Sequence, residues 1–338
     1  MDSKRPHQHR ALSPYTVLTA VLAVAMSVVL TACTWTRDDS DDCQYGFWLR
    51  LSYTYNIMDV EAVQRYIGDT RVYVYDTDGT CVSRIDVTAA QLSKDGWRVR
   101  IEGLAEGDYR FVVWSGLGSN HYTVASDSGS QSDFRLALAG ASPYATALSD
   151  LYYGRLDSVH YTDTYAEHTV SMVKDTNQLT CVAVSVGDDP ITTADCTMQL
   201  LATNGVMDAT NGVATTDCSV YEPYATEAVT IDDPDYGLLG GVMFSLRTLR
   251  LLEGDDSRLQ LLKTSSDSPQ TVLDISVPQY VGLVGEWYTN LGRKVGLQEY
   301  LDRQDYYTLV FIFSEGLDQL LQLKVNNWNV RANNHLKI

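Results

Sequence analysis

The dominant pattern along the chain is an alternation of apolar and polar residues that begins at Phe47. From Phe47 to Tyr55 (FWLRLSYTY) every odd-numbered position is apolar or aromatic, as expected of a strand with one buried face. From Ile57 to Ile67 the apolar positions change to helical spacing, and Gly68 follows where a helix could end. The sequence therefore predicts a strand followed by a short helix.

Later segments repeat the strand pattern. Residues 71–87 and 96–114 each contain two strand-like runs joined by a turn-forming segment, Asp76–Gly79 and Gly103–Asp108 respectively, and residues 126–133 read as a polar loop. Further strand-like runs occupy residues 169–186, 196–205, 241–253, 257–263 and 271–277 and, after a helical interruption at Leu283–Leu301, residues 307–313 and 320–330. This plan predicts a mainly β protein with two similar sandwiches in series, residues 45–168 and residues 169–338.

The N-terminus has the pattern of a lipoprotein leader. A basic segment with Lys4, Arg5 and Arg10 precedes an apolar run at Val17–Ala32, which is short for a membrane-spanning helix and is followed by acidic residues. The run ends in Leu30, Thr31, Ala32 and Cys33, which match the bacterial lipobox. We therefore expect residues 1–32 to be a signal peptide and Cys33 to be the acylated first residue of the mature chain.

Residues 33–44 form an acidic tether that cannot bury apolar surface. Within it, Arg37, Asp38 and Asp39 resemble the surface-export signal of Bacteroidota lipoproteins. The alternative is a plain solvated spacer. The export signal predicts a lipid-anchored protein on the outer face of the outer membrane.

Composition limits the classes of partner. The formal net charge of the 338 residues is -18, so a nucleic acid backbone would be repelled over most of the surface. Five cysteines remain besides Cys33, an odd number, so at least one stays free or pairs outside the chain, unless all are reduced and packed. They are Cys43, Cys81, Cys181, Cys196 and Cys218, of which Cys181 is expected to pack in a strand core.

Residues that carry chemistry are sparse. The mature chain has four histidines, His121, His160, His168 and His335, and none lies in a zinc-binding motif. No nucleophile elbow, phosphate-binding loop or dinucleotide fingerprint is present, and Gly116-Leu117-Gly118 is expected to be a loop. We therefore expect no catalytic residues, no cofactor and no enzyme activity.

Three acidic segments could in principle bind calcium. They are Asp76–Gly79, Asp188–Asp189 and Ile231–Asp235, and the first lacks the third acidic ligand and the distal glutamate of a calcium loop. Turns explain all three more simply, so no metal site is expected.

Several segments in a fixed order resemble the FimB/Mfa-type fimbrial anchor subunits of Bacteroidota. They are CQYGFWLRLSYTYN, YIGDTRVYVYDTDGTCV, GLAEGDYRFVVWSGL, LYYGRLDSV, VKDTNQLTCVAV, QEYLDRQDYYTLVFIF and VNNWNV. The resemblance spans essentially the whole mature chain. Cys81, Cys196 and Cys218 depart from the family pattern, which leaves any disulfide pairing open.

The resemblance implies two transthyretin-like Greek-key β-sandwich domains, each with a short helix. It also implies a lipid anchor in the outer membrane at the base of a fimbria, where the protein holds the fibre and limits its length. The implied partners are fimbrial subunits that bind by strand addition, and the sequence does not locate the accepting groove. The alternative is a surface lipoprotein that binds glycans by stacking on Trp48, Trp97, Trp114, Trp287 or Trp328, although most of these lie in predicted strands, where burial in a core is the more economical explanation.

Overall fold

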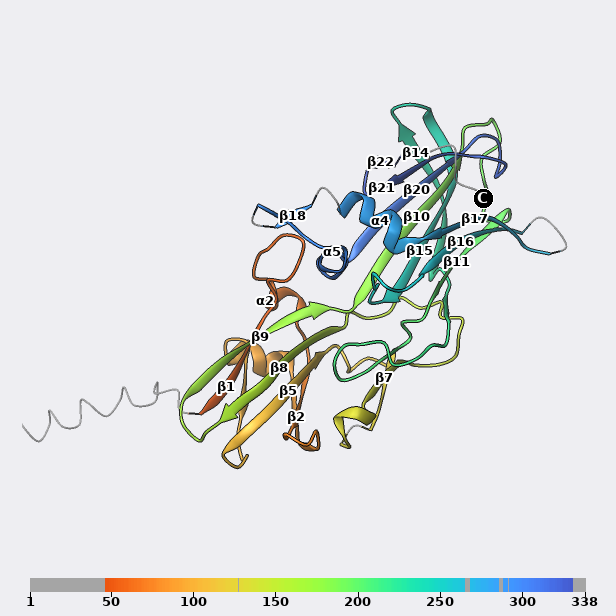
Figure 1. Cartoon of the computed structure of the whole chain (residues 1–338). Helices are drawn as coiled ribbons and strands as arrows, with labels where there is room; N and C mark the ends of the chain where they lie inside the picture. The colour runs from red at the N-terminus through yellow and green to blue at the C-terminus, as the bar shows by residue number, and fades with distance from the viewer. Residues whose placement is uncertain (1–45, 127, 265–267, 286–287, 291, 331–338) are drawn as a thin grey trace, which may run out of the picture. The chain divides into compact units, whose positions relative to one another are not determined.

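The computed structural model describes residues 46–126, 128–264, 268–285, 288–290 and 292–330, and Phe47–Ile338 forms one compact unit. Its helices are α2 (Val63–Tyr66), α3 (Ala89–Lys94), η2 (Gln131–Asp133), α4 (Val277–Gly285) and α5 (Leu297–Arg303). Its strands are β1 (Phe47–Ser52), β2 (Thr70–Tyr75), β3 (Cys81–Val87), β4 (Arg98–Ile101), β5 (Gly107–Ser115), β6 (Tyr122–Ala125), β7 (Arg135–Leu138), β8 (Tyr152–Tyr161), β9 (Ala166–Lys174), β10 (Thr176–Ser185), β11 (Cys196–Ala202), β12 (Val206–Met207), β13 (Ser219–Tyr221), β14 (Ala225–Asp233), β15 (Gly237–Leu249), β16 (Arg258–Lys263), β17 (Gln270–Ser276), β18 (Thr289–Asn290), β19 (Arg293–Lys294), β20 (Tyr306–Phe313), β21 (Leu320–Val325) and β22 (Trp328–Val330) (Figure 1).

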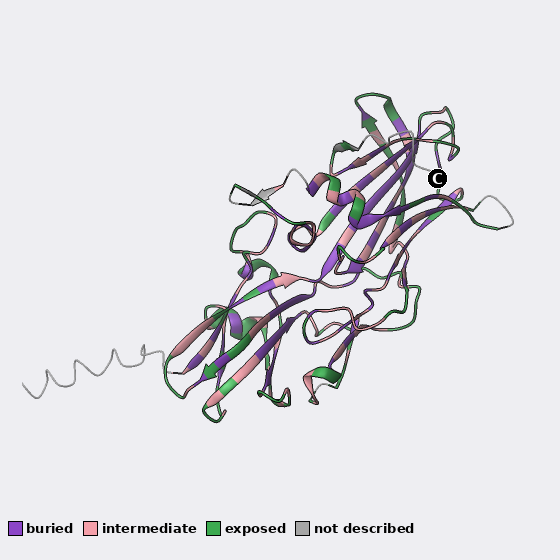
Figure 2. Ribbon diagram, viewed as in Figure 1, coloured by how far each residue is buried: buried purple, intermediate pink, exposed green. Residues whose placement is uncertain are grey.

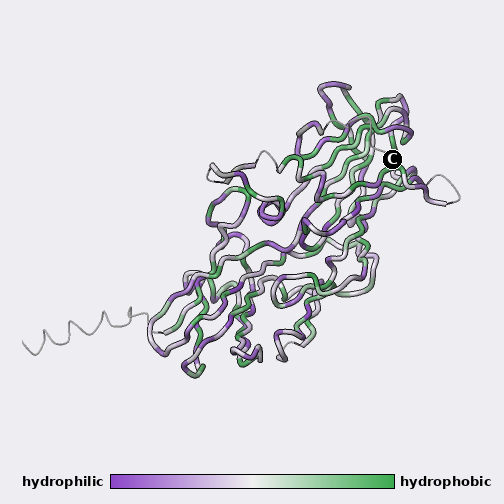
Figure 3. Tube along the Cα trace, viewed as in Figure 1, coloured by the Kyte–Doolittle hydropathy of each residue, from purple (hydrophilic) through white to green (hydrophobic). Residues whose placement is uncertain are grey.

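The N-terminal strands form two packed layers. Their order is β3-β2-β5-β8-β9-β1-β4, and β9 joins the layers because it pairs with β1 over its first residues and with β8 over its last. The core between the layers contains Phe47, Leu49 and Leu51 of β1 opposite Phe111 and Val113 of β5. Buried and more exposed residues alternate along β1, so one of its faces lies in this core, and Figure 3 shows hydrophobic and hydrophilic residues interspersed along the N-terminal strands. This confirms the sandwich-type, mainly β fold.

A third, smaller layer covers the other face of β2, β5 and β8. It consists of β12-β7-β6, and its Phe134 and Leu136 pack with Trp114 of β5 and Tyr153 of β8 in a second core. The Trp114 and Phe134 rings are stacked with centroids 6.2 Å apart. The long connection between β5 and β8 is therefore structured, because it buries the aromatic residues that face away from the first core.

The C-terminal strands form a six-stranded sheet, β14-β15-β10-β20-β21-β22, and a four-stranded sheet, β13-β11-β16-β17. Leu179, Phe244 and Phe311 from the first sheet share a core with Met198 and Leu261 from the second. Strand β10 is central, antiparallel to β15 and parallel to β20, and is buried along nearly its whole length (Figure 2).

A small apolar cluster also lies on the opposite face of β10. Val182 and Val184 of β10 pack there with Ile312 of β20 and Leu239 of β15, and β14 contributes partly buried residues. Gly241 is paired with Val184 in this region, and a Cβ on Gly241 would lie 2.0 Å from the carbonyl oxygen of Ala183. Glycine therefore lets β15 approach β10 closely where both faces of β10 are covered.

The predicted first strand is correct in its buried face but ends three residues early, at Ser52. The helix predicted for Ile57–Ile67 is wrong for most of its length, because only α2 is helical. Asp59 has a left-handed φ of 52°, and the Asn56 side chain donates to the carbonyls of Tyr53 and Val60, which folds the segment into a loop.

Two other helical segments differ from the prediction. The interruption at Leu283–Leu301 is two helices, α4 and α5, joined by a segment that contains the β18–β19 pair. The sequence reading missed α3, although its signal is present, since Thr88 and Gln91 form a capping box at its start.

Strand pairing confirms one predicted hairpin and corrects the other. Strands β2 and β3 pair across the Asp76–Gly79 turn, where the Asp76 carboxylate accepts the N–H groups of Asp78 and Thr80. Strands β4 and β5, joined by residues 102–106, lie in different layers, because β4 pairs with β1.

The predicted domain boundary at residues 168/169 falls inside β9. The chain passes from the N-terminal to the C-terminal strands at Asp175, between β9 and β10. The division into two domains stays a prediction.

Candidate functional site

Strand β1 is the first strand of the compact unit, yet it is not at a sheet edge. It lies between β9, to which it is parallel over six residue pairs from Phe47↔Ala166 to Ser52↔Ser171, and β4, to which it is antiparallel. Phe47, Leu49 and Leu51 are fully buried in the core. We call the space between β9 and β4 the β1 groove, and the protein's own N-terminal strand fills it.

The outer face of β1 is held by charged and aromatic contacts. Arg50 makes two hydrogen bonds to Glu167 of β9, at 2.6 and 3.1 Å, and Arg98 of β4 lies 3.5 Å from the same carboxylate. The hydrogen bond from Arg50 lowers the pKa of Glu167. Trp48 lies under the guanidinium groups of Arg98 and Arg100, 4.7 and 5.7 Å from the ring centroid. Contacts on this face therefore connect β1 to both neighbours.

The chain after β1 is tied back by Glu61. Its carboxylate accepts the N–H groups of Tyr53 and Val63, both at 2.9 Å, and the Ser52 hydroxyl. Burial raises the pKa of Glu61, but these hydrogen bonds outweigh it and the net shift is downward. The loop between β1 and α2 is therefore a fixed structure that ends in a carboxylate-capped turn.

The same loop contacts α5 through Tyr55, Asp59 and Arg303, which we call the clasp. Arg303 Nη1 lies 2.5 Å from Asp59 Oδ1, and the guanidinium lies 4.2 Å from the centroid of the Tyr55 ring. Arg303 Nε also donates to Glu299 at 3.0 Å, and the arginine is buried. Because the charge is paired twice and stacked on a ring, the clasp joins the chain that follows β1 to the helix that precedes β20.

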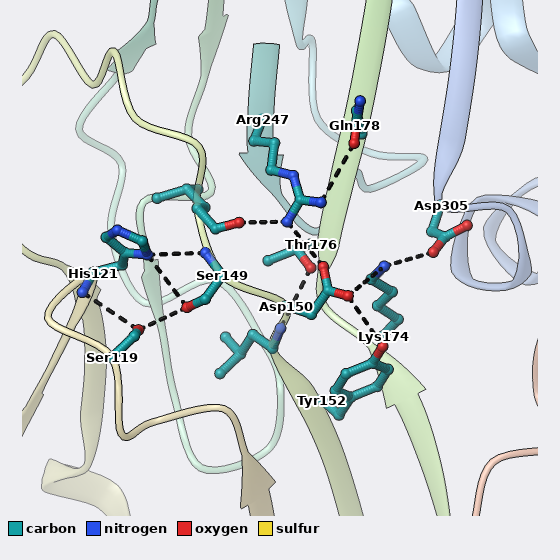
Figure 4. Close-up of polar contacts among 12 residues, drawn as sticks. Ser119, His121, Ser149, Asp150, Tyr152, Lys174, Thr176, Gln178, Arg247 and Asp305 are labelled. Carbon is teal, nitrogen blue, oxygen red and sulfur yellow. Dashed lines mark hydrogen bonds and ion pairs between the residues drawn. The ribbon is translucent and has the colours of Figure 1, made fainter. Parts of the chain in front are cut away.

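A polar network lies where the N-terminal and C-terminal strands meet (Figure 4). Lys174 Nζ, at the end of β9, lies 3.2 Å from Asp150 Oδ2 and 2.7 Å from Asp305 Oδ2. Arg247 of β15 lies 2.9 Å from the other oxygen of Asp150 and also donates to the carbonyl of Leu148. We call this set the junction network. Breaking such a partly buried network costs more than breaking an exposed ion pair, because the remaining charges lose their partners.

Gly116 belongs to the same region and is a loop residue, as predicted. Its φ is +99°, and a Cβ there would lie 2.1 Å from the carbonyl oxygen of Asp150. Glycine is required for this close approach, and the segment is not a nucleotide-binding loop.

A serine–histidine cluster lies beside the junction network. His121 Nδ1 accepts the backbone N–H of Ser149 at 2.9 Å, and the Ser149 hydroxyl is 3.3 Å from the same nitrogen and 2.7 Å from the hydroxyl of Ser119 (Figure 4). A general base needs a free ring nitrogen to accept a hydroxyl proton, and here the backbone amide occupies it. The cluster fixes the connection before β8 and does not have the geometry of a nucleophile with its base.

Asp175, between β9 and β10, is completely buried. Its Oδ1 accepts from Asn211 at 2.9 Å, while its Oδ2 has no hydrogen-bond partner among the residues that the structure describes. Burial raises the pKa of Asp175 to about 7, although the nearby Arg250, itself paired with Asp302 at 2.7 Å, acts in the opposite direction. The folded protein therefore keeps this carboxyl group protonated over most of the acidic range.

This shift predicts a pH dependence of stability. The folded protein holds the Asp175 proton up to about pH 7, whereas the unfolded chain releases it near the ordinary aspartate pKa of 3.8. Stability from this group is thus present at low pH and is lost as pH rises between about 4 and 7. We expect Asp175→Asn to remove this loss. The free energy of unfolding of the variant, relative to that of wild type, should therefore be about 2 kcal/mol higher at pH 7.5 than at pH 5.

Urea unfolding of both proteins at the two pH values measures this effect. Asp157→Asn, at an exposed carboxylate on β8, is the matched control and should leave the pH profile unchanged. Parallel profiles for wild type and Asp175→Asn would show that Asp175 is ionised throughout.

The residues predicted for lipidation and export, Leu30, Thr31, Ala32, Cys33, Arg37, Asp38 and Asp39, lie outside the described residues, as do Cys43, Trp287 and His335. Cys81, Cys181, Cys196 and Cys218 are free thiols. Cys181 is fully buried, which confirms its predicted core position, and burial raises the pKa of its thiol well above the usual range. The pairing state of Cys43 stays open.

The remaining histidine candidates that the structure describes make contacts that account for their positions in the fold. His160 makes an exposed hydrogen bond to Asp108 at 2.9 Å, which raises its pKa, and the His168 ring stacks on Phe47. Within the described part of the chain, no group of three histidine, cysteine or acidic side chains could hold a metal ion. In the same part, no helix is long and apolar enough to cross a membrane.

Sequence reasoning missed the clasp and the junction network, although segments that carry them stood out. VKDTNQLTCVAV contains Lys174 and Asp175, and QEYLDRQDYYTLVFIF contains Asp302, Arg303 and Asp305. Their partners on other elements lie from 24 positions away, for Lys174 and Asp150, to 244 positions away, for Arg303 and Asp59, so their pairing could not be read from local spacing.

Comparison with known proteins agrees with this fold. A family model described as fimbrillin-A associated anchor proteins Mfa1 and Mfa2 matches residues 40–334. A candidate adhesin from Bacteroides thetaiotaomicron is 24% identical, with a TM-score of 0.73 over 86% of this chain and 99% of its own. A candidate polysaccharide-binding protein from the same species is also 24% identical, with a TM-score of 0.71 over the same shares. The fimbrial anchor protein Mfa2 from Porphyromonas gingivalis is 16% identical, with a TM-score of 0.61 over 85% of this chain and 99% of its own. No curated protein matches the chain.

Proposed function

Since the chain belongs to the family of fimbrillin-A associated anchor proteins, we propose that it is an outer-membrane lipoprotein that anchors fimbriae to the cell surface and limits their length by ending subunit polymerisation. The partners are fimbrial subunits, and the attachment to the membrane is the acylated Cys33. The role is structural, and the serine–histidine cluster, whose base nitrogen is occupied, is consistent with that.

The observation that carries this proposal is the occupied β1 groove. A gap between two strands of a sheet is the kind of site into which another chain can add a strand, since main-chain hydrogen bonds are available on both sides. Here the protein's own β1 forms those bonds with β9 and β4 and buries three side chains in the core. A neighbouring subunit therefore finds no vacancy at this position, which supports termination of the fibre. Contact with the fibre is then made by strand addition elsewhere, at sheet edges such as β3 and β14, each of which pairs with a single strand in the described part of the chain.

The sequence of the tether supports the location. Cys33 and the start of β1 are separated by a short acidic segment, so the acyl chains and the first strand of the body are linked almost directly. Arg37, Asp38 and Asp39 then direct the lipoprotein to the outer face of the membrane. The rest of the mature chain forms the two proposed domains, with the chain passing from the first to the second between β9 and β10 and not at residues 168/169.

Deleting the protein tests the proposal. We expect the deletion strain to keep its fimbriae but to make fibres that are longer or more easily shed into the medium, because both the stop and the attachment are missing. Electron microscopy of fibre length, with fimbrial subunit measured in cells and in medium, checks this. Complementation with wild-type protein is the control and should restore short, cell-bound fibres.

Unchanged fibre length together with unchanged attachment would contradict the anchor function and would favour the glycan-binding alternative. The structure leaves that alternative little support in the tryptophans proposed for it. Trp114 is fully buried, and the face of Trp48 is covered by Arg98 and Arg100.

A further inference from the structure

We propose that β1 is a shear-loaded mechanical clamp that carries tension from the membrane tether to the C-terminal strands, and that the Asp59–Arg303 clasp secures its far end. This inference rests on the proposed anchor function, since only an attached fibre would place the tether under tension. It concerns how the body resists that tension and not whether a fibre is bound.

The direction of β1 sets the geometry of loading. Phe47, where the tether enters, pairs with Ala166 at the beginning of β9, and Ser52 pairs with Ser171 near its end. Strand β9 then continues through Asp175 into β10 of the six-stranded sheet (Figure 1). Tension between Phe47 and the C-terminal strands therefore acts along the axis of β1.

Loading along the strand axis makes the bonds of β1 share the force. Its backbone hydrogen bonds run across the strand, perpendicular to it in the antiparallel pair with β4 and slanted in the parallel pair with β9, so all of them must shear together before β1 can slide. If β1 were pulled sideways from its first residue, the same bonds would break one after another, each at low force. The parallel β1–β9 pair is thus the resistant arrangement for this direction of pull.

Side-chain contacts oppose the same sliding motion. A shift of β1 by one residue would move Leu49 and Leu51 out of the core and would turn Arg50 inward, away from Glu167. The guanidinium groups of Arg98 and Arg100, which lie over the Trp48 ring, add a second cross-strand restraint on the outer face.

The clasp receives the tension that passes beyond Ser52. The next segment is folded on itself by Asn56 and Glu61, and Asp59 connects it to Arg303 of α5. The chain leaves α5 through Gln304 into β20, which is parallel to β10 in the six-stranded sheet. Both partners of the N-terminal segment, β9 and α5, thus run directly into the C-terminal strands.

Single-molecule force measurements on the full mature chain, made without acyl groups, test the clamp. Handles at residues 33 and 188 load β1 along its axis, because Asp188 is exposed just after the end of β10. Handles at residues 33 and 102 instead peel β1 from β4, because Glu102 follows the residue paired with Phe47. We expect clearly higher unfolding forces for the first pair of handles. Equal forces for the two pairs would overturn the proposal.

Two variants test the side-chain restraints at the first pair of handles. Glu167→Gln weakens the outer-face contacts and Arg303→Gln removes the clasp charge, and each should raise the unfolding rate at a given force about tenfold. Arg258→Gln, which breaks an exposed pair with Asp274 between β16 and β17, is the matched control and should have no effect. An Arg303→Gln protein indistinguishable from this control would overturn the role of the clasp. A Glu167→Gln protein indistinguishable from it would overturn the role of the outer-face contacts. These measurements use the isolated protein, so a failed clamp and a failed anchor function are separable.

Discussion

Replacing Cys33 with alanine is expected to remove essentially all of the protein from the outer-membrane fraction while its β-sandwich stays folded. In the proposed lipoprotein, acyl chains on Cys33 supply the membrane affinity, at about 0.8 kcal/mol for each buried methylene group, and two or more chains make the attachment practically permanent. The body cannot replace them, because the acidic character of the chain, whose 338 residues carry a net charge of -18, opposes binding to an anionic surface.

Separation of inner membrane, outer membrane and soluble fractions measures the effect, and circular dichroism of the purified variant checks the fold. Cys43→Ala is the matched control, since it removes a thiol ten positions further along the same segment and should leave the protein in the outer membrane. Persistence of the Cys33 variant in the outer membrane of a strain that lacks fimbriae would refute the lipoprotein assignment.

Gly241→Val is expected to destabilise the compact unit by about 4 kcal/mol or more, enough to prevent accumulation of folded protein. A Cβ at this position lies 2.0 Å from the carbonyl oxygen of Ala183 and 2.8 Å from the Cα of Val184, and both are backbone atoms of the central strand. The strands can relieve the clash only by separating, and separation breaks the β10–β15 ladder and opens the apolar cores on both faces of β10.

Yield of soluble protein and urea unfolding of whatever accumulates measure this effect. Gly254→Ala is the control, because a Cβ there meets no atom within 4 Å. A Gly241→Val protein as stable as the Gly254→Ala protein would mean that β15 does not approach β10 as closely as the structure shows.

The sequence alone was enough to predict several parts of the fold. The period-two pattern at Phe47–Tyr55 predicted the buried face of β1, because successive side chains of a strand point to opposite faces. The acidic turn at Asp76–Gly79 predicted the β2–β3 hairpin, because a glycine with positive φ and a carboxylate that caps backbone amides are local features. The resemblance to fimbrial anchor subunits gave the family, which the match over residues 40–334 shows.

Long-range pairing could only be decided by the tertiary structure. The residues Gly96–Trp114 read as two joined strands, yet β4 pairs with β1 in one layer and β5 with β2 in the other. An alternating pattern states which face of a strand is buried but not which strand lies beside it. For the same reason the sequence could not show that β1 occupies an interior position between β9 and β4.

The ion pairs of the clasp and of the junction network also depend on long-range pairing that the sequence does not show. Charged residues were visible beside apolar strands, but the pairing of Asp59 with Arg303 and of Asp150 with Lys174 and Arg247 depends on segments that are far apart along the chain. The burial of Asp175, and hence its raised pKa, likewise depends on Asn211 and Arg250 brought to it by folding. The sequence determined which segments form strands and which of their faces are buried, and it predicts the lipid attachment at Cys33, since these depend on neighbouring residues. The filled groove and the paired charges were decided by the fold, because their energies arise from contacts between residues that only folding brings together.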